Sequence, residues 1–548
     1  MKSQTSKYVW FFFAVACFLK SSSTFCMLKS VFVFFAITLV AAFVRFDFGV
    51  LSHQFFWDEF WYNEVALRML QGKYSMGAER IPGWSVIIAS YNYFFDAMNM
   101  AGIYLNLFLG SLTAGISYLV FRNFKCAPWV QVVHALFWIF SVKHIVWSRA
   151  GETNISSLFA VSLFWLLCFE FWKKPNVMKV LGLSVISTIA LSLRIENGLL
   201  FIILIYVFWS RRETIAISKT FPALLIPLVL IKPIINSIEF YSAYNWTQLG
   251  TQGEEHTVNF SIINVIPNVY HYWVNLFEIL NSPVLWFLFL IGGWKSFRTQ
   301  REYIISVFLF LTMYSCAYFS GWLKHMGPDK VFIIFLPFLF SLSASGLNAI
   351  AQAFSKSGEK TRERLAYTGL IIGLIFVELL PEERGYFVTV VALYAAFEWI
   401  REQKNWNLPV PKYALVVPTF VIIIAFGFSS DFKNVELIND DEKILMTQLP
   451  KQIKNEVLGD QVLYVQSEDS ANFIPGLKVR SAKSLLQAGH IKENEKEFYL
   501  QDIACSKTKV WFERNHGNDC DQVLARVPMT VVKTFHYGTA SFILYRLN

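Results

Sequence analysis

Three carboxylates stand among aromatic and aliphatic residues in the stretch FFWDEFWYNEVALRML, which covers residues 55–70: Asp58, Glu59 and Glu64. A carboxylate can act as a general acid or base. Carboxylates are also favoured in the first turn of a helix by the helix dipole, so helix-start chemistry is the other open interpretation. Adjacent helical residues point about 100° apart, so at most one of Asp58 and Glu59 can face a given reacting atom.

A second charged group follows in GKYSMGAERIPGW, where Glu79 and Arg80 precede Pro82 and Gly83. Proline and glycine break a helical pattern, so we expect a turn here. A guanidinium binds phosphate in a bidentate manner, which would suit Arg80 to an anionic ligand. A solvated loop is the competing interpretation.

Helical spacing between these two groups indicates what positions them. Trp61, Val65 and Met69 form an apolar stripe that starts after Trp57 and stops near Gly72, and the aromatic run after residue 83 has the length of a second helix. We predict two amphipathic helices that lie on a membrane surface.

The composition is that of a polytopic membrane protein. Of 548 residues, 55% are hydrophobic and 16% charged, and the mean hydropathy is +0.44. The net charge of +9 follows from Lys and Arg in loops, which set orientation in the bilayer, and needs no nucleic-acid partner.

Apolar runs bounded by charges predict about 13 transmembrane helices. They are 29–48, 99–120, 129–147, 155–172, 177–193, 197–210, 219–236, 283–295, 303–321, 330–350, 366–381, 386–400 and 413–430. The even-numbered loops are basic, which places them in the cytoplasm of a multi-pass protein of the inner or plasma membrane.

This orientation places the loops 49–98 and 237–282 and the tail on the extracytoplasmic side. We expect an uncertain amino-terminal extension (1–27), a transmembrane domain (28–430) and a soluble extracytoplasmic α/β domain (431–548) with strand-like runs. The extension is either signal-like or precedes a true start at Met27.

Two smaller features complete the pattern. Cys505 and Cys520 share the polar tail and could form a disulfide in an oxidising compartment, whereas the cysteines in or beside apolar segments are expected to be buried hydrophobes. Ionisable residues gather toward the outer ends of the spans and either snorkel or line a cavity open to the outside. They are Arg45, Lys143, His144, Lys232 and Glu378.

The acidic pair at the start of the first outer loop, the helix after it and the turn Glu79-Arg80-Ile81-Pro82 resemble the C-type membrane glycosyltransferases. The similarity is greatest to the branch with protein O-mannosyltransferases and the lipid A aminoarabinose transferase. It extends to the segments 148–159, 191–200 and 323–339 and to the topology of residues 28–430.

This resemblance implies transfer of a sugar from a polyprenyl-phosphate donor to a hydroxyl of a lipid, glycan or protein on the extracytoplasmic side. It makes Asp58 the general base, with Glu59 in support, and Arg80 a ligand of the lipid phosphate. Such a phosphate leaves without strong acid assistance, so one base and a cationic clamp suffice.

Further cations for this clamp lie in short outer loops, although each one taken singly is as well explained by a structural role. They are Arg149, Arg194, Lys324 and Lys330. Arg194 is our first choice because LRIEN matches a segment of the family.

The resemblance also implies a divalent metal ion held by Glu79 and a histidine of the second large loop. His256, beside Glu254 and Glu255, is the first candidate, and His271 is the alternative. Imidazole and carboxylate ligands suit Zn or Mn, and Mg is a further option. Ordinary loop histidines are the competing interpretation.

Two other functions remain open. A transporter or flippase would explain the many spans and the charges at Lys143, His144 and Glu378, and it predicts inverted repeats, which are not evident. A non-catalytic assembly or receptor protein would act through its tail.

Overall fold

The computed structural model describes residues 26–49, 57–70, 83–95, 100–214, 283–315 and 332–356, and in the carboxy-terminal part 449, 451–458, 461–465, 477–481, 485–486, 497–501, 520–537 and 540–548. The chain divides into two compact units. Unit 1 comprises residues 1–44, 109–145 and 154–435; unit 2 comprises residues 45–108, 146–153 and 436–548.

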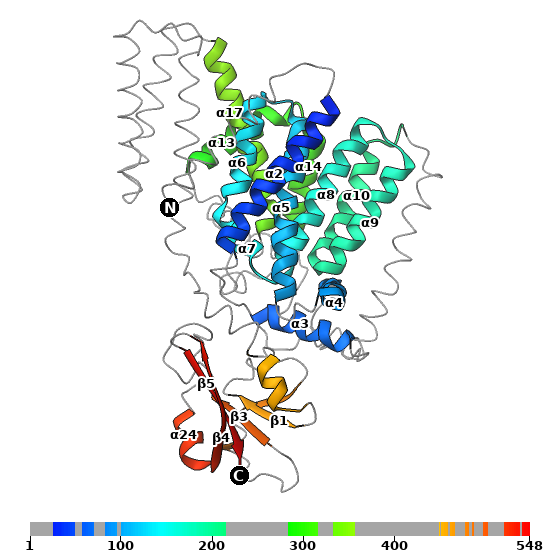
Figure 1. Cartoon of the computed structure of the whole chain (residues 1–548). Helices are drawn as coiled ribbons and strands as arrows, with labels where there is room; N and C mark the ends of the chain where they lie inside the picture. Colours follow the sequence, from blue (N-terminus) through cyan, green and yellow to red (C-terminus); the bar gives the residue numbers. More distant parts are fainter. Residues whose placement is uncertain are drawn as a thin grey trace, which may run out of the picture. The chain divides into compact units, whose positions relative to one another are not determined.

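Long apolar helices dominate the part of the chain before residue 357 (Figure 1). They are α2 (Cys26–Gly49), α5 (Ala101–Phe121), α6 (Pro128–Phe140), α8 (Thr153–Lys173), α9 (Val177–Leu193), α10 (Leu200–Trp209), α13 (Pro283–Phe297), α14 (Arg301–Ser315) and α17 (Leu336–Lys356). By length and composition, the segments Ala101–Phe124, Thr153–Lys173 and Ile333–Ala353 could each cross a membrane. Apart from α6, these helices coincide with predicted spans, which confirms them as helical elements. The spans 219–236, 366–381, 386–400 and 413–430 lie outside the described residues, and the total of 13 remains a prediction.

One predicted span was wrong. Residues 129–147 form two helices, because α6 ends at Phe140 and α7 (Val142–Ser148) begins after Ser141. Ser141 has extended backbone angles (φ −61°, ψ 110°), and its Oγ accepts a hydrogen bond from the amide of His144 at 3.4 Å. A serine in this position caps a helix, which explains why the chain restarts there.

Helices α13 and α17 pack at very short range in unit 1. A Cβ at Gly292 would overlap the carbonyl oxygen of Leu342, and one at Gly346 would overlap that of Leu288. Ser343 Oγ donates to the Leu285 carbonyl at 2.9 Å across the same contact. Small residues therefore let the two backbones touch, as in other membrane helix pairs.

Two short helices in unit 2 confirm the helices predicted for the first large loop. They are α3 (Trp57–Leu70) and α4 (Gly83–Phe95), and they pack against each other. Helix α3 buries Tyr62, Val65 and Ala66, whereas Leu70 is exposed. The carboxy-terminal end of α4 exposes three large aromatic side chains: Tyr93, Phe94 and Phe95.

The carboxy-terminal part contains a five-stranded mixed sheet with the order β2-β1-β3-β5-β4. Its elements are β1 (Val462–Val465), β2 (Lys478–Ser481), β3 (Glu497–Gln501), α24 (Cys520–Arg526), β4 (Met529–Tyr537) and β5 (Ala540–Leu547). β1 pairs in parallel with β2 and β3, and β5 pairs antiparallel with β3 and β4. The strand-like runs of the sequence, DQVLYVQS, VVKTFHYG and ASFILYRL, correspond to β1, β4 and β5, whereas β2 and β3 were not predicted.

The cysteine predictions are tested at two positions. Cys126 and Cys168 are buried free thiols, as expected for small hydrophobic residues. Cys505 and Cys316 lie outside the described residues.

Candidate functional site

A buried charged loop joins α7 to α8 in unit 2, over Ser148 to Glu152. Arg149 is 3% exposed and Glu152 1%. The loop turns tightly, since the amides of Arg149 and Ala150 donate to the carbonyls of Val146 and Trp147 at 3.1 and 3.2 Å. A buried ionisable side chain is costly unless it is paired or binds a ligand, so this loop is the first candidate for a functional site.

Three successive carbonyls of the loop accept hydrogen bonds from other helices. Asn106 of α5 donates through Nδ2 to Ala150 O at 2.5 Å and to Glu152 O at 2.6 Å. Trp84 of α4 donates through Nε1 to Gly151 O at 2.7 Å. Both side chains are fully buried. The loop backbone is therefore fixed from two helices.

Two further contacts hold the ends of the loop. Gly102 of α5 lies so close to Gly151 that a Cβ at Gly102 would come within 2.8 Å of Gly151 O. Arg45 of α2, itself fully buried, donates through Nε to Ser148 Oγ at 3.3 Å. Residues from α2, α4 and α5 thus position one short loop.

Arg149 gives the loop a buried cationic side chain. Burial lowers the pKa of Arg149 to about 10, so this side chain is still a cation at neutral pH. A guanidinium removed from water and held by a fixed loop can bind phosphate or carboxylate oxygens strongly. Glu152 lies three residues away and can balance the charge.

Arg194 forms a second charged cluster, within unit 1. It ends α9 with an extended backbone (φ −148°, ψ 133°). Its Nη2 lies 3.1 Å from Glu196 Oε1 and its Nε lies 3.4 Å from Glu196 Oε2, so the pair is bidentate. Its Nη1 donates a short hydrogen bond to Asn154 Oδ1 on α8. The pair is largely buried.

The turn that carries this cluster is the 3-10 helix η4 (Ile195–Leu199). Asn197 is fully buried and donates through Nδ2 to Ser157 Oγ and to Ala190 O, both at 2.8 Å. These contacts tie η4 to both α8 and α9. Arg194 and Glu196 therefore sit on a fixed turn.

The other predicted site residues are described less fully. Asp58 and Glu59 lie in the first turn of α3, as predicted; their side chains are outside the described part. Predicted residues outside the described part of the chain altogether are Glu79, Arg80, His256, His271, Lys324 and Lys330. Within the residues that are described, no group of three or more His, Cys, Asp or Glu could hold a metal ion.

Of the ionisable residues predicted near the ends of the spans, the structure describes three. Arg45 and His144 are fully buried, which is inconsistent with simple snorkelling, and Lys143 is half-buried. Lys232 and Glu378 lie outside the described residues.

Sequence reasoning missed the residues that hold the Arg149 loop. Asn106 and Trp84 donate hydrogen bonds to loop residues that lie 44 and 67 positions further along the chain. One signal was present for Asn106, which is an amide in the apolar run AGIYLNLFLG of a membrane helix. Such residues are usually buried and hydrogen-bonded.

Comparison with solved structures gives similar folds despite low sequence identity. ArnT from Cupriavidus metallidurans, bound to undecaprenyl phosphate, has 13% identity and a TM-score of 0.54 over 94% of this chain and 97% of ArnT. The apo structure of the same protein has 12% identity and a TM-score of 0.53 over the same shares.

A third structure is more distant. The Archaeoglobus fulgidus oligosaccharyltransferase tethered to an acceptor peptide has 12% identity and a TM-score of 0.47, over 88% of this chain and 70% of that one. Comparison with family models and with curated protein sequences gives no match. The chain therefore has a fold similar to that of ArnT.

Proposed function

We propose that this protein is a glycosyltransferase that moves a sugar from a polyprenyl-phosphate donor to a hydroxyl acceptor on the extracytoplasmic side of the membrane. The main support is the structural match to ArnT over 94% of the chain, because that ArnT structure contains bound undecaprenyl phosphate. The buried Arg149 loop supports the proposal, because the reaction needs a fixed cation for a lipid phosphate.

Arg149 is the main phosphate ligand in this proposal. Its guanidinium is buried and its loop is held through three carbonyls, so the backbone that carries Arg149 is fixed before an anion binds. Arg194 was our first choice from the sequence. Because Glu196 already engages its guanidinium in two places, we now assign Arg194 to positioning the α9–η4 turn.

The acceptor side of the reaction rests on α3. We assign Asp58 as the base that takes the proton from the acceptor hydroxyl, and Glu59 as its supporting neighbour. Both stand in the first turn of α3, where the amide dipoles stabilise the carboxylate form. Arg80, Lys324 and Lys330 complete the proposed clamp for the departing phosphate.

A divalent ion is part of the proposal through Glu79 and His256, with His271 as the alternative ligand. Zn, Mn or Mg bound there would add positive charge near the phosphate. Removal of bound metal by a chelator should then lower donor binding, and Glu79→Gln should lower metal content in elemental analysis. Unchanged metal content in that variant would remove Glu79 from the ligand set.

Binding of undecaprenyl phosphate to the purified full-length protein tests the role of Arg149. We expect Arg149→Gln to weaken binding at least about tenfold, since a charge-assisted hydrogen bond to phosphate is lost. Arg149→Lys should weaken it less, because the charge is kept and only the fork geometry changes. Arg211→Gln serves as a matched control: it removes an arginine of unit 1 that is paired with Glu302 at 3.4 Å.

Two results would contradict this assignment. If Arg149→Gln binds the lipid as tightly as the wild type while both remain folded, Arg149 is not the phosphate ligand. The second result is flipping without chemistry. If the wild type moves a polyprenyl-phosphate sugar from one leaflet of a liposome to the other, and the sugar lipid stays covalently unchanged although acceptors are present, the protein is a flippase.

A further inference from the structure

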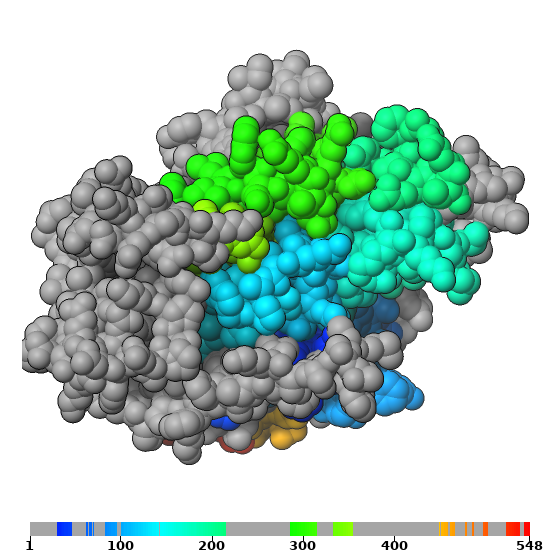
Figure 2. All heavy atoms as spheres, turned by 90° about the horizontal axis from the view of Figure 1, so that it is seen from above, coloured from blue at the N-terminus to red at the C-terminus, as the bar shows by residue number. Residues whose placement is uncertain are grey.

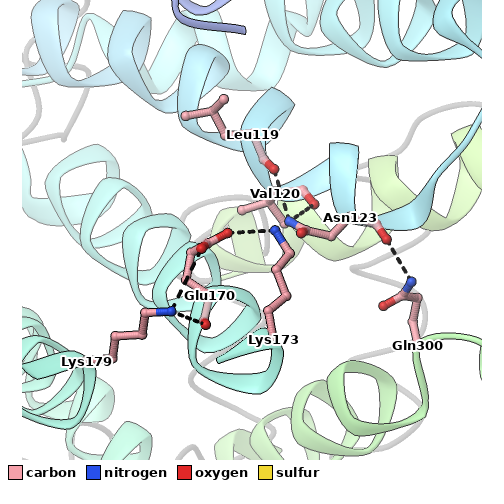
Figure 3. Close-up of polar contacts among 7 residues, drawn as sticks. All are labelled: Leu119, Val120, Asn123, Glu170, Lys173, Lys179 and Gln300. Carbon is pink, nitrogen blue, oxygen red and sulfur yellow. Dashed lines mark hydrogen bonds and ion pairs between the residues drawn. The ribbon is translucent and has the colours of Figure 1, made fainter. Parts of the chain in front are cut away.

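Four basic loops meet at one end of unit 1. The amide of Gln300, between α13 and α14, donates to Asn123 O at the end of α5 at 2.8 Å (Figure 3). Arg211, after α10, pairs with Glu302 of α14 and donates through Nε to Trp172 O of α8 at 3.4 Å. The prediction that these loops share one side of the membrane is consistent with this convergence. Figure 2 looks onto the molecule from above, where these helix groups lie together in cyan, blue-green and green.

Only part of the positive charge at this end is neutralised. Lys173 and Lys179 share Glu170, at 2.7 and 4.0 Å, and Arg211 has Glu302 (Figure 3). A further set of cations is exposed and forms no ion pair with any residue that the structure describes. We call this set the basic end: Lys125, Lys174, Arg212, Lys295, Arg298 and Arg301.

Exposed tryptophans accompany these cations at the ends of apolar helices. Trp209, at the end of α10, is 60% exposed, and Arg212 Cζ lies 4.5 Å from the centre of its ring. Trp294, at the end of α13, is 80% exposed. Tryptophan prefers the headgroup level of a bilayer, so the basic end stands at that level too.

We propose that the basic end binds the anionic headgroups of phospholipids in the membrane leaflet on its own side. Six exposed cations without ion-pair partners among the described residues give this end a positive potential that attracts anions. The phosphate groups of lipids lie at headgroup level, as the exposed tryptophans do. Their oxygens are negatively charged and accept hydrogen bonds from Lys and Arg. This inference is independent of the proposed sugar transfer.

Lipid selectivity of the full-length protein tests the proposal. The protein is reconstituted in phosphatidylcholine bilayers that carry a trace of spin-labelled phosphatidylglycerol or spin-labelled phosphatidylcholine. Electron spin resonance then gives the fraction of each label that the protein immobilises. We expect a preference for phosphatidylglycerol that weakens as salt is added, because exposed charges are screened.

The variant Lys295→Gln/Arg298→Gln/Arg301→Gln should lower this preference about five-fold or more, since each cation near an anionic surface is worth roughly a factor of five. Lys125→Gln/Lys174→Gln is a second variant on other loops, in case the first does not fold. The matched control, Lys451→Gln/Lys478→Gln/Arg526→Gln, removes the same charge from exposed sites of the carboxy-terminal part and should keep the preference. An undiminished preference in folded basic-end variants, or an equal loss in the control, would overturn the proposal.

Discussion

Removal of the Asn106 side chain should destabilise the buried loop on which the proposed site depends. Asn106→Ala takes the donor from two carbonyls, Ala150 O at 2.5 Å and Glu152 O at 2.6 Å, in a place from which water is excluded. A buried polar group left unsatisfied costs about 1–3 kcal/mol. Two such groups predict a loss of about 2–6 kcal/mol in the free energy of unfolding.

Asn123→Ala is the matched control for this change. Asn123 also donates to two carbonyls, Leu119 O at 3.1 Å and Val120 O at 2.9 Å, but it is half-buried and both acceptors lie in the helix just before it. We expect its loss to cost about 1 kcal/mol.

Thermal unfolding in detergent gives the stability of both variants, and amide hydrogen exchange reports on the loop itself. Exchange of the amides from Ala150 to Thr153 should accelerate in Asn106→Ala and stay at the wild-type rate in Asn123→Ala. Equal stability of the two variants, with loop exchange unchanged in both, would refute the view that Asn106 fixes the loop.

Further expectations concern the helix contact and the second arginine. Gly292→Ala should lower the yield of monodisperse protein in size-exclusion chromatography, because its Cβ overlaps Leu342 O, whereas Gly293→Ala should be tolerated since its Cβ would lie 3.7 Å from Leu342 Cδ1. Equal yields would refute the close packing. Arg194→Leu should destabilise the protein by about 3–5 kcal/mol in thermal unfolding, because it leaves the carboxylate of Glu196 buried without its partner. The double variant Arg194→Leu/Glu196→Leu should recover much of this loss, and a double variant no more stable than the single one would argue against the ion pair.

Much of the helical architecture could be predicted from the sequence because membrane helices are encoded locally. An apolar run between charges is enough to locate α8 or α9, since backbone hydrogen bonds must be made within the segment. The break at Ser141 was missed because a single serine inside an apolar run is compatible with a continuous helix, and its capping role depends on the backbone. Strand β2, with the sequence KVRS, was missed because it is short and charged, so its pairing with β1 is decided by the sheet.

The candidate site was predictable only in part. The predicted topology placed Arg149 in a short outer loop, and the resemblance favoured Arg194. The short separation of Arg194 and Glu196 in LRIEN allows their pairing. The partners that fix the Arg149 loop come from other helices, and such contacts depend on how the helices pack. Trp84 is an example, because its bond to Gly151 O joins residues 67 positions apart.

Transfer of sugar from a synthetic polyprenyl-phosphate donor to cell-envelope acceptors by the purified protein, detected by mass spectrometry, tests the central claim most directly. The account predicts a glycosylated product with the wild type, a loss of at least about a hundredfold in rate with Asp58→Asn, as for removal of a general base, and a smaller loss with Glu59→Gln. Asp58→Asn protein that is folded, inserted and transfers sugar at the wild-type rate would contradict it.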